Sequence, residues 1–158
     1  MLQPAAIDGL AFARSAAVLE GWLGIEALPR LAHSGCSRLS LHYVLTGEIN
    51  ARGKPGLRLA LDGTARLECQ RCLNHLDFPL QIETQLELAS SEAEIAAADD
   101  DIERIVAARE MRIATLVEDE VLLALPMAPK HERCGTTAEL GMNAESSASS
   151  RSRRTLNR

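Results

Sequence analysis

The chain has 158 residues, of which 46% are hydrophobic, so it is long enough for one domain with a real core. Its 17 basic and 22 acidic residues give a formal net charge of −5, which argues against indiscriminate binding to polyanions. Aromatic residues make up 3% of the chain, and this scarcity disfavours binding of single-stranded nucleic acid on a platform of stacked rings.

The N-terminal region does not have the pattern of a signal peptide. Arg14 interrupts the one apolar run there, Leu10 to Val18, and no other run approaches the roughly 20 residues of a membrane span. We therefore expect a cytoplasmic protein without membrane contact. In that reducing compartment, its four cysteines are expected to be metal ligands or buried thiols rather than disulfides.

The first elements along the chain are a short helix and a segment of uncertain structure. Asp8 can cap an Ala-rich helix that reaches about Val18 and is stopped by Gly21. Residues 23–32 are ambiguous and are interpreted as an extended segment broken at Pro29.

Three runs of alternating apolar and polar residues follow, and they predict strands with one buried face. The first run is residues 39–49, the second 57–67 and the third 76–88, with turn residues Lys54-Pro55-Gly56 after the first. Asp62-Gly63 could form a tight hairpin turn. One uninterrupted strand is preferred, because the apolar parity is kept through Gly63. The three runs together predict an antiparallel meander.

The second half of the chain is predicted to add a helix to this sheet. Residues 90–101 are acidic and Ala-rich and are interpreted as a flexible crossover, followed by a short strand at 102–106. A helical pattern begins near Arg112 and Pro126 ends it. The fold class is therefore α+β, with a meander packed against helices. We expect a single globular domain at 1–140 and a disordered Ser/Arg-rich tail at 141–158.

Two pairs of soft ligands flank this second half. Cys69 and Cys72 lie at the predicted tip of the hairpin between the second and third strands, and His131 and Cys134 follow the helix. Together they could hold one structural zinc, because four protein ligands leave no position for a water. His75 is a spare ligand candidate.

Other interpretations of the cysteines remain open. The thiols could be ordinary side chains without metal, or a redox dithiol, although a reactive C-x-x-C usually begins a helix rather than linking two strands. Cys36 is interpreted as a small buried apolar residue.

The carboxylates Glu118, Asp119 and Glu120 invite a catalytic interpretation. Consecutive helical residues point about 100° apart, so the three cannot converge on one ion. An acidic first helical turn on a solvated face is the simpler explanation, with Thr115 and Glu118 as a capping box. No other catalytic arrangement stands out, so we expect a protein that is not an enzyme.

A group of basic residues near the second strand can form a strip that grips phosphates by charge and shape. The alternative is cross-strand pairing with Glu48, Glu83 and Glu87. The candidate nucleic-acid-binding residues are Arg52, Lys54, Arg58, Arg66 and Arg71.

Three motifs in this order resemble the large ribosomal RNA subunit accumulation proteins, the YceD family, over about residues 57–134. They are C-x-R-C-L at Cys69 to Leu73, V-E-D-E at Val117 to Glu120, and L-P-x-x-P-x-H at Leu125 to His131. The resemblance places the family's cysteine pair on Cys69 and Cys72, its acidic helix on residues 118–120 and its histidine on His131. This chain departs from the family in having Arg112 where an Asp often precedes the helix, and in ending without an Asn-Pro-Phe-rich segment.

The resemblance implies a non-enzymatic ribosome biogenesis factor. It would support the synthesis, processing or stability of 23S ribosomal RNA by binding precursor rRNA or an assembly protein. One alternative is an adaptor that binds a ribosomal protein or a processing nuclease through its acidic half, without RNA contact. The other is an RNA-processing enzyme that uses the V-E-D-E carboxylates. No small-molecule substrate is evident.

Overall fold

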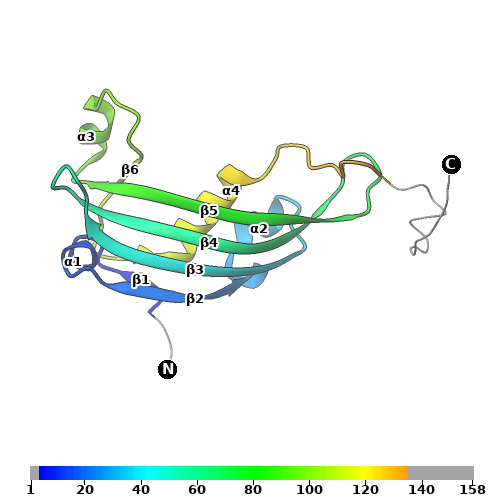
Figure 1. The fold of residues 1–158 in the computed structure, drawn as a ribbon, viewed down its shortest axis with the longest axis horizontal. Helices are drawn as coiled ribbons and strands as arrows, with labels where there is room; N and C mark the ends of the chain where they lie inside the picture. Colours follow the sequence, from blue (N-terminus) through cyan, green and yellow to red (C-terminus); the bar gives the residue numbers. More distant parts are fainter. Residues whose placement is uncertain (1–3, 135–158) are drawn as a thin grey trace.

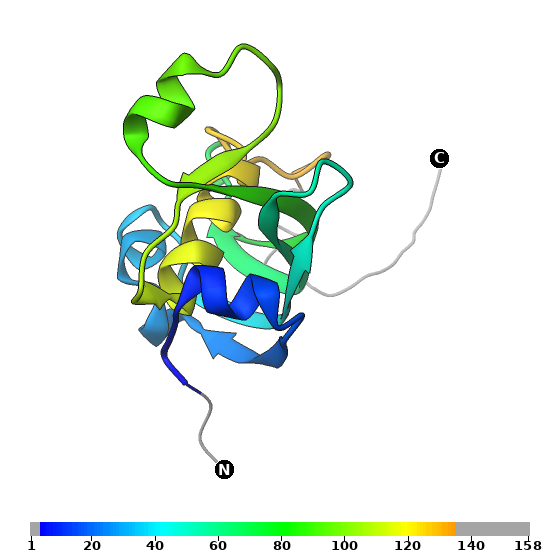
Figure 2. The same ribbon diagram turned by 90° about the vertical axis from the view of Figure 1, so that its left-hand side faces the viewer.

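The computed structural model describes residues 4–134, and its main feature is a curved sheet of five strands in the order β2-β3-β4-β5-β6. Helices α1, α2 and α4 lie on the concave side of this sheet, whereas α3 projects from its end beside β5 and β6 (Figures 1 and 2). The predicted α+β class with an antiparallel meander against helices is confirmed. In chain order the elements are β1 (Ala6–Ile7), α1 (Gly9–Arg14), β2 (Val18–Gly24), the 3-10 helix η1 (Ile25–Ala27), α2 (Pro29–His33), β3 (Arg38–Ile49), β4 (Pro55–Glu68), β5 (His75–Ala89), α3 (Glu92–Ala97), β6 (Arg104–Val106), β7 (Met111–Arg112) and α4 (Ile113–Ala124).

Strands β3, β4 and β5 form the predicted meander. Strand β4 runs without interruption through Gly63, which pairs with Leu41 on one side and Leu80 on the other, so the hairpin-turn alternative does not occur. A β-carbon at Gly63 would collide with the carbonyl oxygen of Ser40. Glycine therefore permits the close backbone approach that the curvature of the sheet requires at this point.

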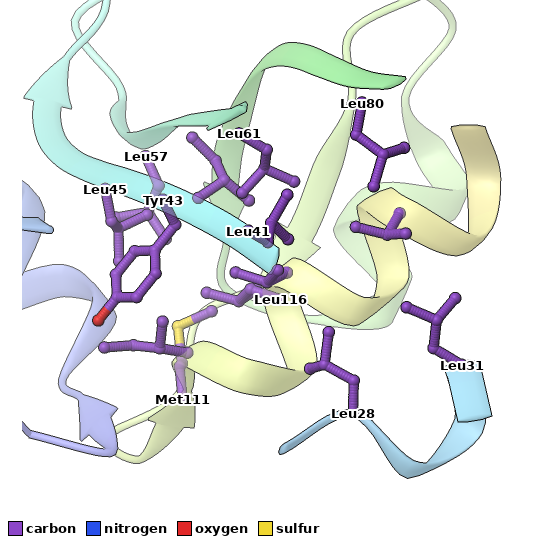
Figure 3. Packing of buried hydrophobic residues seen from close by; sticks show 14 of the residues in the cluster. Leu28, Leu31, Leu41, Tyr43, Leu45, Leu57, Leu61, Leu80, Met111 and Leu116 are labelled. Atoms are coloured by element: carbon purple, nitrogen blue, oxygen red, sulfur yellow. The ribbon is translucent and has the colours of Figure 1, made fainter. Parts of the chain in front are cut away.

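The core lies between the concave face of the sheet and the helices. Figure 3 shows Leu41 and Tyr43 of β3 directed toward Leu116 of α4 and toward Met111, which precedes that helix. Helix α1 packs so closely on β3 that a β-carbon at Gly47 would collide with the carbonyl oxygen of Phe12. The alternation of apolar residues along the strands therefore supplies one side of a single core.

The N-terminal part differs from the sequence prediction. Asp8 does cap α1, since its Oδ1 accepts a hydrogen bond from the backbone N–H of Ala11 (3.1 Å). The helix ends at Arg14 rather than near Val18, because Ala16 adopts a left-handed backbone conformation (φ 52°) that turns the chain. Residues 18–24 then pair with β3 as the edge strand β2, so the predicted stop of a helix at Gly21 is wrong.

The segment after β2 is not extended. It contains η1 and then α2, which starts at Pro29. Proline is suited to the first position of a helix, because the N–H that it lacks has no partner there. Pro29 therefore begins a helical turn instead of breaking an extended segment.

The acidic crossover after β5 is partly ordered. Ser91 caps helix α3 by accepting a hydrogen bond from the N–H of Glu94 (3.2 Å), so the prediction of a wholly flexible crossover is wrong. The short strand predicted at 102–106 is confirmed as β6, which runs parallel to the end of β5.

A buried carboxylate, Glu87, joins this part of the molecule. It is 4% exposed and accepts hydrogen bonds from Asn50 Nδ2 (2.9 Å) and Arg104 Nε (3.0 Å), while Arg52 Nε lies 3.2 Å away. Burial alone raises the pKa of Glu87, but these hydrogen bonds and the two guanidinium charges outweigh burial and lower that pKa. Glu87 therefore ties β5, β6 and the turn after β3 together as an anion.

Helix α4 begins after Arg112 and its last residue is Ala124, just before the predicted stop at Pro126. Arg112 occupies the N-cap position without a side-chain cap, so the predicted capping box of Thr115 and Glu118 does not form. Among residues 4–134, no helix combines the length and apolar character that a membrane crossing requires. The predicted tail at 141–158 lies outside the described residues, and the domain boundary at 140 stays a prediction.

Candidate metal centre

The turn between β4 and β5 presents the first pair of ligands. The backbone N–H of Cys69 donates to the carbonyl of Asn74 (2.9 Å), and the N–H of Leu73 donates to the carbonyl of Cys69 (2.8 Å). Leu73 adopts a left-handed conformation (φ 66°), which is uncommon for a residue other than glycine. These contacts fold the chain back on itself, so that Cys72 returns toward Cys69.

The segment that follows α4 supplies the second pair. It crosses the hairpin tip, and Figure 1 shows this segment, in orange, beside the green β4–β5 turn. The backbone N–H of Gln70 donates to the carbonyl of Pro129 (2.8 Å), and the N–H of His131 donates to Cys69 Sγ (3.4 Å). The two halves of the site are therefore joined by main-chain contacts as well as by their ligand side chains.

The four ligand atoms converge on one point and all lie within 4.8 Å of one another. Cys69 Sγ is 3.6 Å from Cys134 Sγ, and His131 Nδ1 is 3.4 Å from Cys72 Sγ and 3.9 Å from Cys134 Sγ. Zinc bonds of about 2.3 Å to sulfur and 2.0–2.1 Å to nitrogen give a tetrahedron with edges of roughly 3.5–3.8 Å. Three thiol groups and one imidazole at these separations fit one tetrahedral zinc ion.

The imidazole of His131 is oriented for this role. Its Nε2 lies 3.0 Å from the backbone carbonyl of His75. Because a carbonyl can only accept a hydrogen bond, Nε2 carries the proton and Nδ1 presents its lone pair to the cysteines. The spare candidate His75 therefore contributes its carbonyl, and its side chain is not part of the cluster.

The cluster also favours an ionised thiol at its buried end. Burial alone raises the pKa of Cys69, but hydrogen bonds from the backbone N–H groups of Cys72, His131 and Arg71 and from the thiol of Cys134 lower it to about 5. The pKa of Cys134 is raised to about 11, by burial and by the neighbouring Cys69 and Cys72. Backbone donors around a sulfur are typical of a site that stabilises thiolates.

Cys36 lies away from this cluster. It is 3% exposed and packs in the core, and its thiol donates to the carbonyl of Arg38 (3.2 Å). The prediction of a small buried residue is confirmed.

The acidic residues of α4 do not form a solvated first turn. Glu118 is the sixth residue of the helix and is 4% exposed. Its carboxylate accepts hydrogen bonds from Arg30 Nε (3.0 Å) and from the backbone N–H of Leu31 (2.9 Å), and Asp119 accepts one from Arg30 Nη2 (2.6 Å). Glu118 therefore fixes α2 against α4, and the interpretation of this residue as a surface charge was wrong.

The structure gives the predicted basic strip several carboxylate partners. Arg58 pairs with Glu48 (3.2 Å), and Arg66 pairs with Asp77 (3.1 Å). Arg52 is engaged by Glu87, described above, so three of the five candidates have cross-strand or neighbouring acidic partners. Their contact with nucleic acid stays a prediction.

Arg71 belongs to a different group, which the sequence reasoning missed. It is exposed at the hairpin tip, and exposed Lys130 and Arg133 lie on the segment that crosses that tip. Within residues 4–134, none of the three has an ion-pair partner. The sequence does show two basic residues, Lys130 and Arg133, close together. Their closeness to Arg71 could not be predicted, because it arises only when the segment after α4 folds across the hairpin tip.

Comparison with protein-family models matches residues 57–154 to the family described as "Large ribosomal RNA subunit accumulation protein YceD". The matched region contains both pairs of candidate ligands and the acidic helix. No curated protein sequence and no solved structure matches the chain.

Proposed function

Because the chain belongs to the YceD family of large ribosomal RNA subunit accumulation proteins, we propose that it supports the accumulation of 23S rRNA by binding the precursor RNA at a zinc-stabilised hairpin tip. The observation that carries this proposal is the convergence of Cys69, Cys72, His131 and Cys134 from two segments that also bear exposed basic residues. The proposed location is the cytoplasm, where reduced thiols are available to a metal.

The metal has a structural part in this proposal. Cys69, Cys72, His131 and Cys134 would hold the ion, and a site closed by four protein ligands gives it no open position for catalysis. The clamp would keep the exit segment of α4 on the hairpin tip. In that position Lys130 and Arg133 remain beside Arg71, where they form what we call the basic tip.

The basic tip is better suited to phosphate contact than the strand strip. Arg58 and Arg66 would have to leave Glu48 and Asp77 in order to bind a phosphate, whereas the side chains of the basic tip have no carboxylate to leave among the described residues. Leu73 is 65% exposed beside Arg71 and offers an apolar contact to an unstacked base. We expect binding by charge and shape, with little sequence reading.

The role is proposed to be non-catalytic. Of the three carboxylates in V-E-D-E, Glu118 and Asp119 are engaged by Arg30, and Glu118 is shielded from solvent. An RNA-processing enzyme would require carboxylates that converge on the reacting phosphate, and consecutive helical residues diverge. Cleavage of precursor rRNA by the purified protein would contradict this part of the proposal.

RNA contact is tested by ultraviolet crosslinking in cells, followed by salt-dependent binding with purified protein. Precursor 23S rRNA should be enriched among the crosslinks. The basic-tip variant Arg71→Gln/Lys130→Gln/Arg133→Gln should bind the recovered RNA more weakly, with a salt slope reduced by about 2 for three lost phosphate contacts.

Two variants make the comparison specific. The strand variant Arg58→Gln/Arg66→Gln should retain most of the affinity, and Arg14→Gln/Arg109→Gln/Arg112→Gln removes three exposed charges elsewhere as a matched control. An equal loss in the control would mean unspecific charge attraction. Recovery of protein partners after RNase treatment, without rRNA crosslinks, would favour the adaptor function instead.

A further inference from the structure

A groove beside α4, with Arg30 of α2 in its lining, is separate from the candidate metal centre. It has a volume of about 390 Å³, which is near the lower end of the roughly 300–1,000 Å³ typical of ligand sites and suits a side-chain anchor better than a cofactor. Its apolar lining comes from three elements. The lining residues are Leu86 of β5, Ile105 of β6, and Leu116, Leu122 and Leu123 of α4.

The rim of this groove is acidic. Glu103 stands on one side, and Asp119 and Glu120 stand on the other. Arg30 is the one cation of the lining, and Glu118 and Asp119 already engage it. Within the described residues, Glu103 and Glu120 have no ion-pair partner, so the rim keeps an excess of negative charge.

Glu120 lies within electrostatic reach of the other two carboxylates of the rim. The pKa of Glu120 is raised by burial and by the charges of Glu103 and Asp119. A cation placed between these groups would relieve the repulsion. A phosphate would increase it, which makes RNA an unfavourable occupant of this groove.

The apolar lining continues onto the surface of the helix. Leu123 lies at the groove edge and is 77% exposed, so it extends the apolar surface of the groove to solvent. Figure 2 shows α4, in yellow, beside β6 and below α3. The Glu87 contacts hold β6 on β5, and the Glu118 contacts hold α2 on α4. The surface of the groove combines an apolar floor with negative edges.

We propose that this groove, bounded by Glu103, Glu120 and Leu123, binds a basic amphipathic segment of a partner protein. An apolar side chain of the segment would enter the groove, and flanking lysine or arginine residues would pair with the rim. The inference rests on the proposed assembly role only for the biological source of the segment, which would be a basic protein of the assembling subunit.

A synthetic peptide tests the groove directly. The probe is a fluorescein-labelled peptide of about 14 residues with leucines at helical spacing and lysines between them, and its partner peptide has glutamine at every lysine. Anisotropy titrations with the full-length protein should show binding of the lysine peptide and at least about tenfold weaker binding of the glutamine peptide.

Substitutions then locate the site. Glu103→Gln/Glu120→Gln should weaken the lysine peptide about tenfold, and Leu123→Ser should weaken it several-fold without altering the fold, since this side chain is exposed. Asp62→Asn/Glu83→Gln removes two charges from the opposite face of the sheet as a matched control, and Val18→Ser removes an exposed apolar side chain there. An equal loss in these controls overturns the proposal.

Two other occupants are distinguished by the same assay. If Arg151→Gln/Arg153→Gln/Arg154→Gln raises the affinity for the peptide, the chain's own C-terminal segment competes for the groove and the partner proposal is overturned. If single-stranded RNA displaces the peptide and the groove substitutions weaken RNA binding, the occupant is RNA. If the native protein binds the lysine peptide but gives no precursor rRNA crosslinks in cells, the proposed function has failed and this inference has not.

Discussion

Removal of zinc should lower the stability of the whole fold by an amount that follows from the chain path. The ligands Cys72 and His131 are 59 residues apart in the sequence, so the ion closes a loop of that length. In the entropic treatment of cross-links, such a loop corresponds to about 4 kcal/mol. For a domain of this size, 4 kcal/mol corresponds to a fall in the unfolding temperature of roughly 15 °C.

Thermal unfolding followed by circular dichroism tests this value on protein purified without an affinity tag. Elemental analysis should give one zinc per chain, and dialysis against a strong chelator should lower the unfolding temperature, which added zinc restores. His131→Asn should behave as the chelated protein. His75→Gln is the matched control, because this neighbouring imidazole is not part of the cluster and should leave the zinc content unchanged. Near-zero zinc in the purified protein, or equal unfolding temperatures with and without chelator, would refute the reasoning.

Three further outcomes follow from buried contacts. Glu118→Ala leaves Arg30 and the backbone N–H of Leu31 without their acceptor, so urea unfolding should show that the free energy of unfolding falls by about 2–3 kcal/mol. The exposed Asp119→Asn should lower it by under about 1 kcal/mol. Similar losses in the two variants would mean that Glu118 does not hold α2 against α4. Because the fold lowers the pKa of Glu87, its contribution to stability is present above the ordinary pKa of a glutamate, near 4.3, and is lost as the pH falls through the lowered value. Unfolding temperatures measured between about pH 6 and 3 should therefore fall less steeply in Glu87→Gln than in the wild type, and parallel curves would exclude this contribution. Gly47→Ala should destabilise by about 3 kcal/mol in the same urea assay, since its methyl group meets the backbone of α1, and a neutral effect would mean that α1 can shift away.

The central sheet was predictable because its strands have one buried face. A period of two over residues 39–49, 57–67 and 76–88 marks such a face, and the preserved parity across Gly63 correctly favoured one strand. Strand β2 was not predictable in this way. This strand lies at the sheet edge and has apolar residues on both faces. Val18 and Trp22, which are 59% and 70% exposed, are on the outer face, so the sequence shows no alternation of apolar and polar residues.

The candidate ligands could be predicted because cysteine and histidine have few other uses at such spacings. The role of Glu118 could not be, because its partner Arg30 is 88 residues away and on a different element. Local spacing made the carboxylate resemble a cap or a surface charge. The basic tip was missed for a similar reason, since Arg71 and Lys130 become neighbours only when the exit segment crosses the hairpin.

The division of the metal centre between two distant segments has a consequence for synthesis of the protein. After Cys72 is translated, 59 further residues are added before His131 is complete, which takes roughly 3–12 seconds at bacterial elongation rates. During that interval the nascent chain offers an ion two thiols and no enclosing shell. Metal capture would therefore be a late event in biosynthesis. A chain released from a ribosome stalled within α4 would contain every strand of the sheet but lack His131 and Cys134, so its metal site would be incomplete.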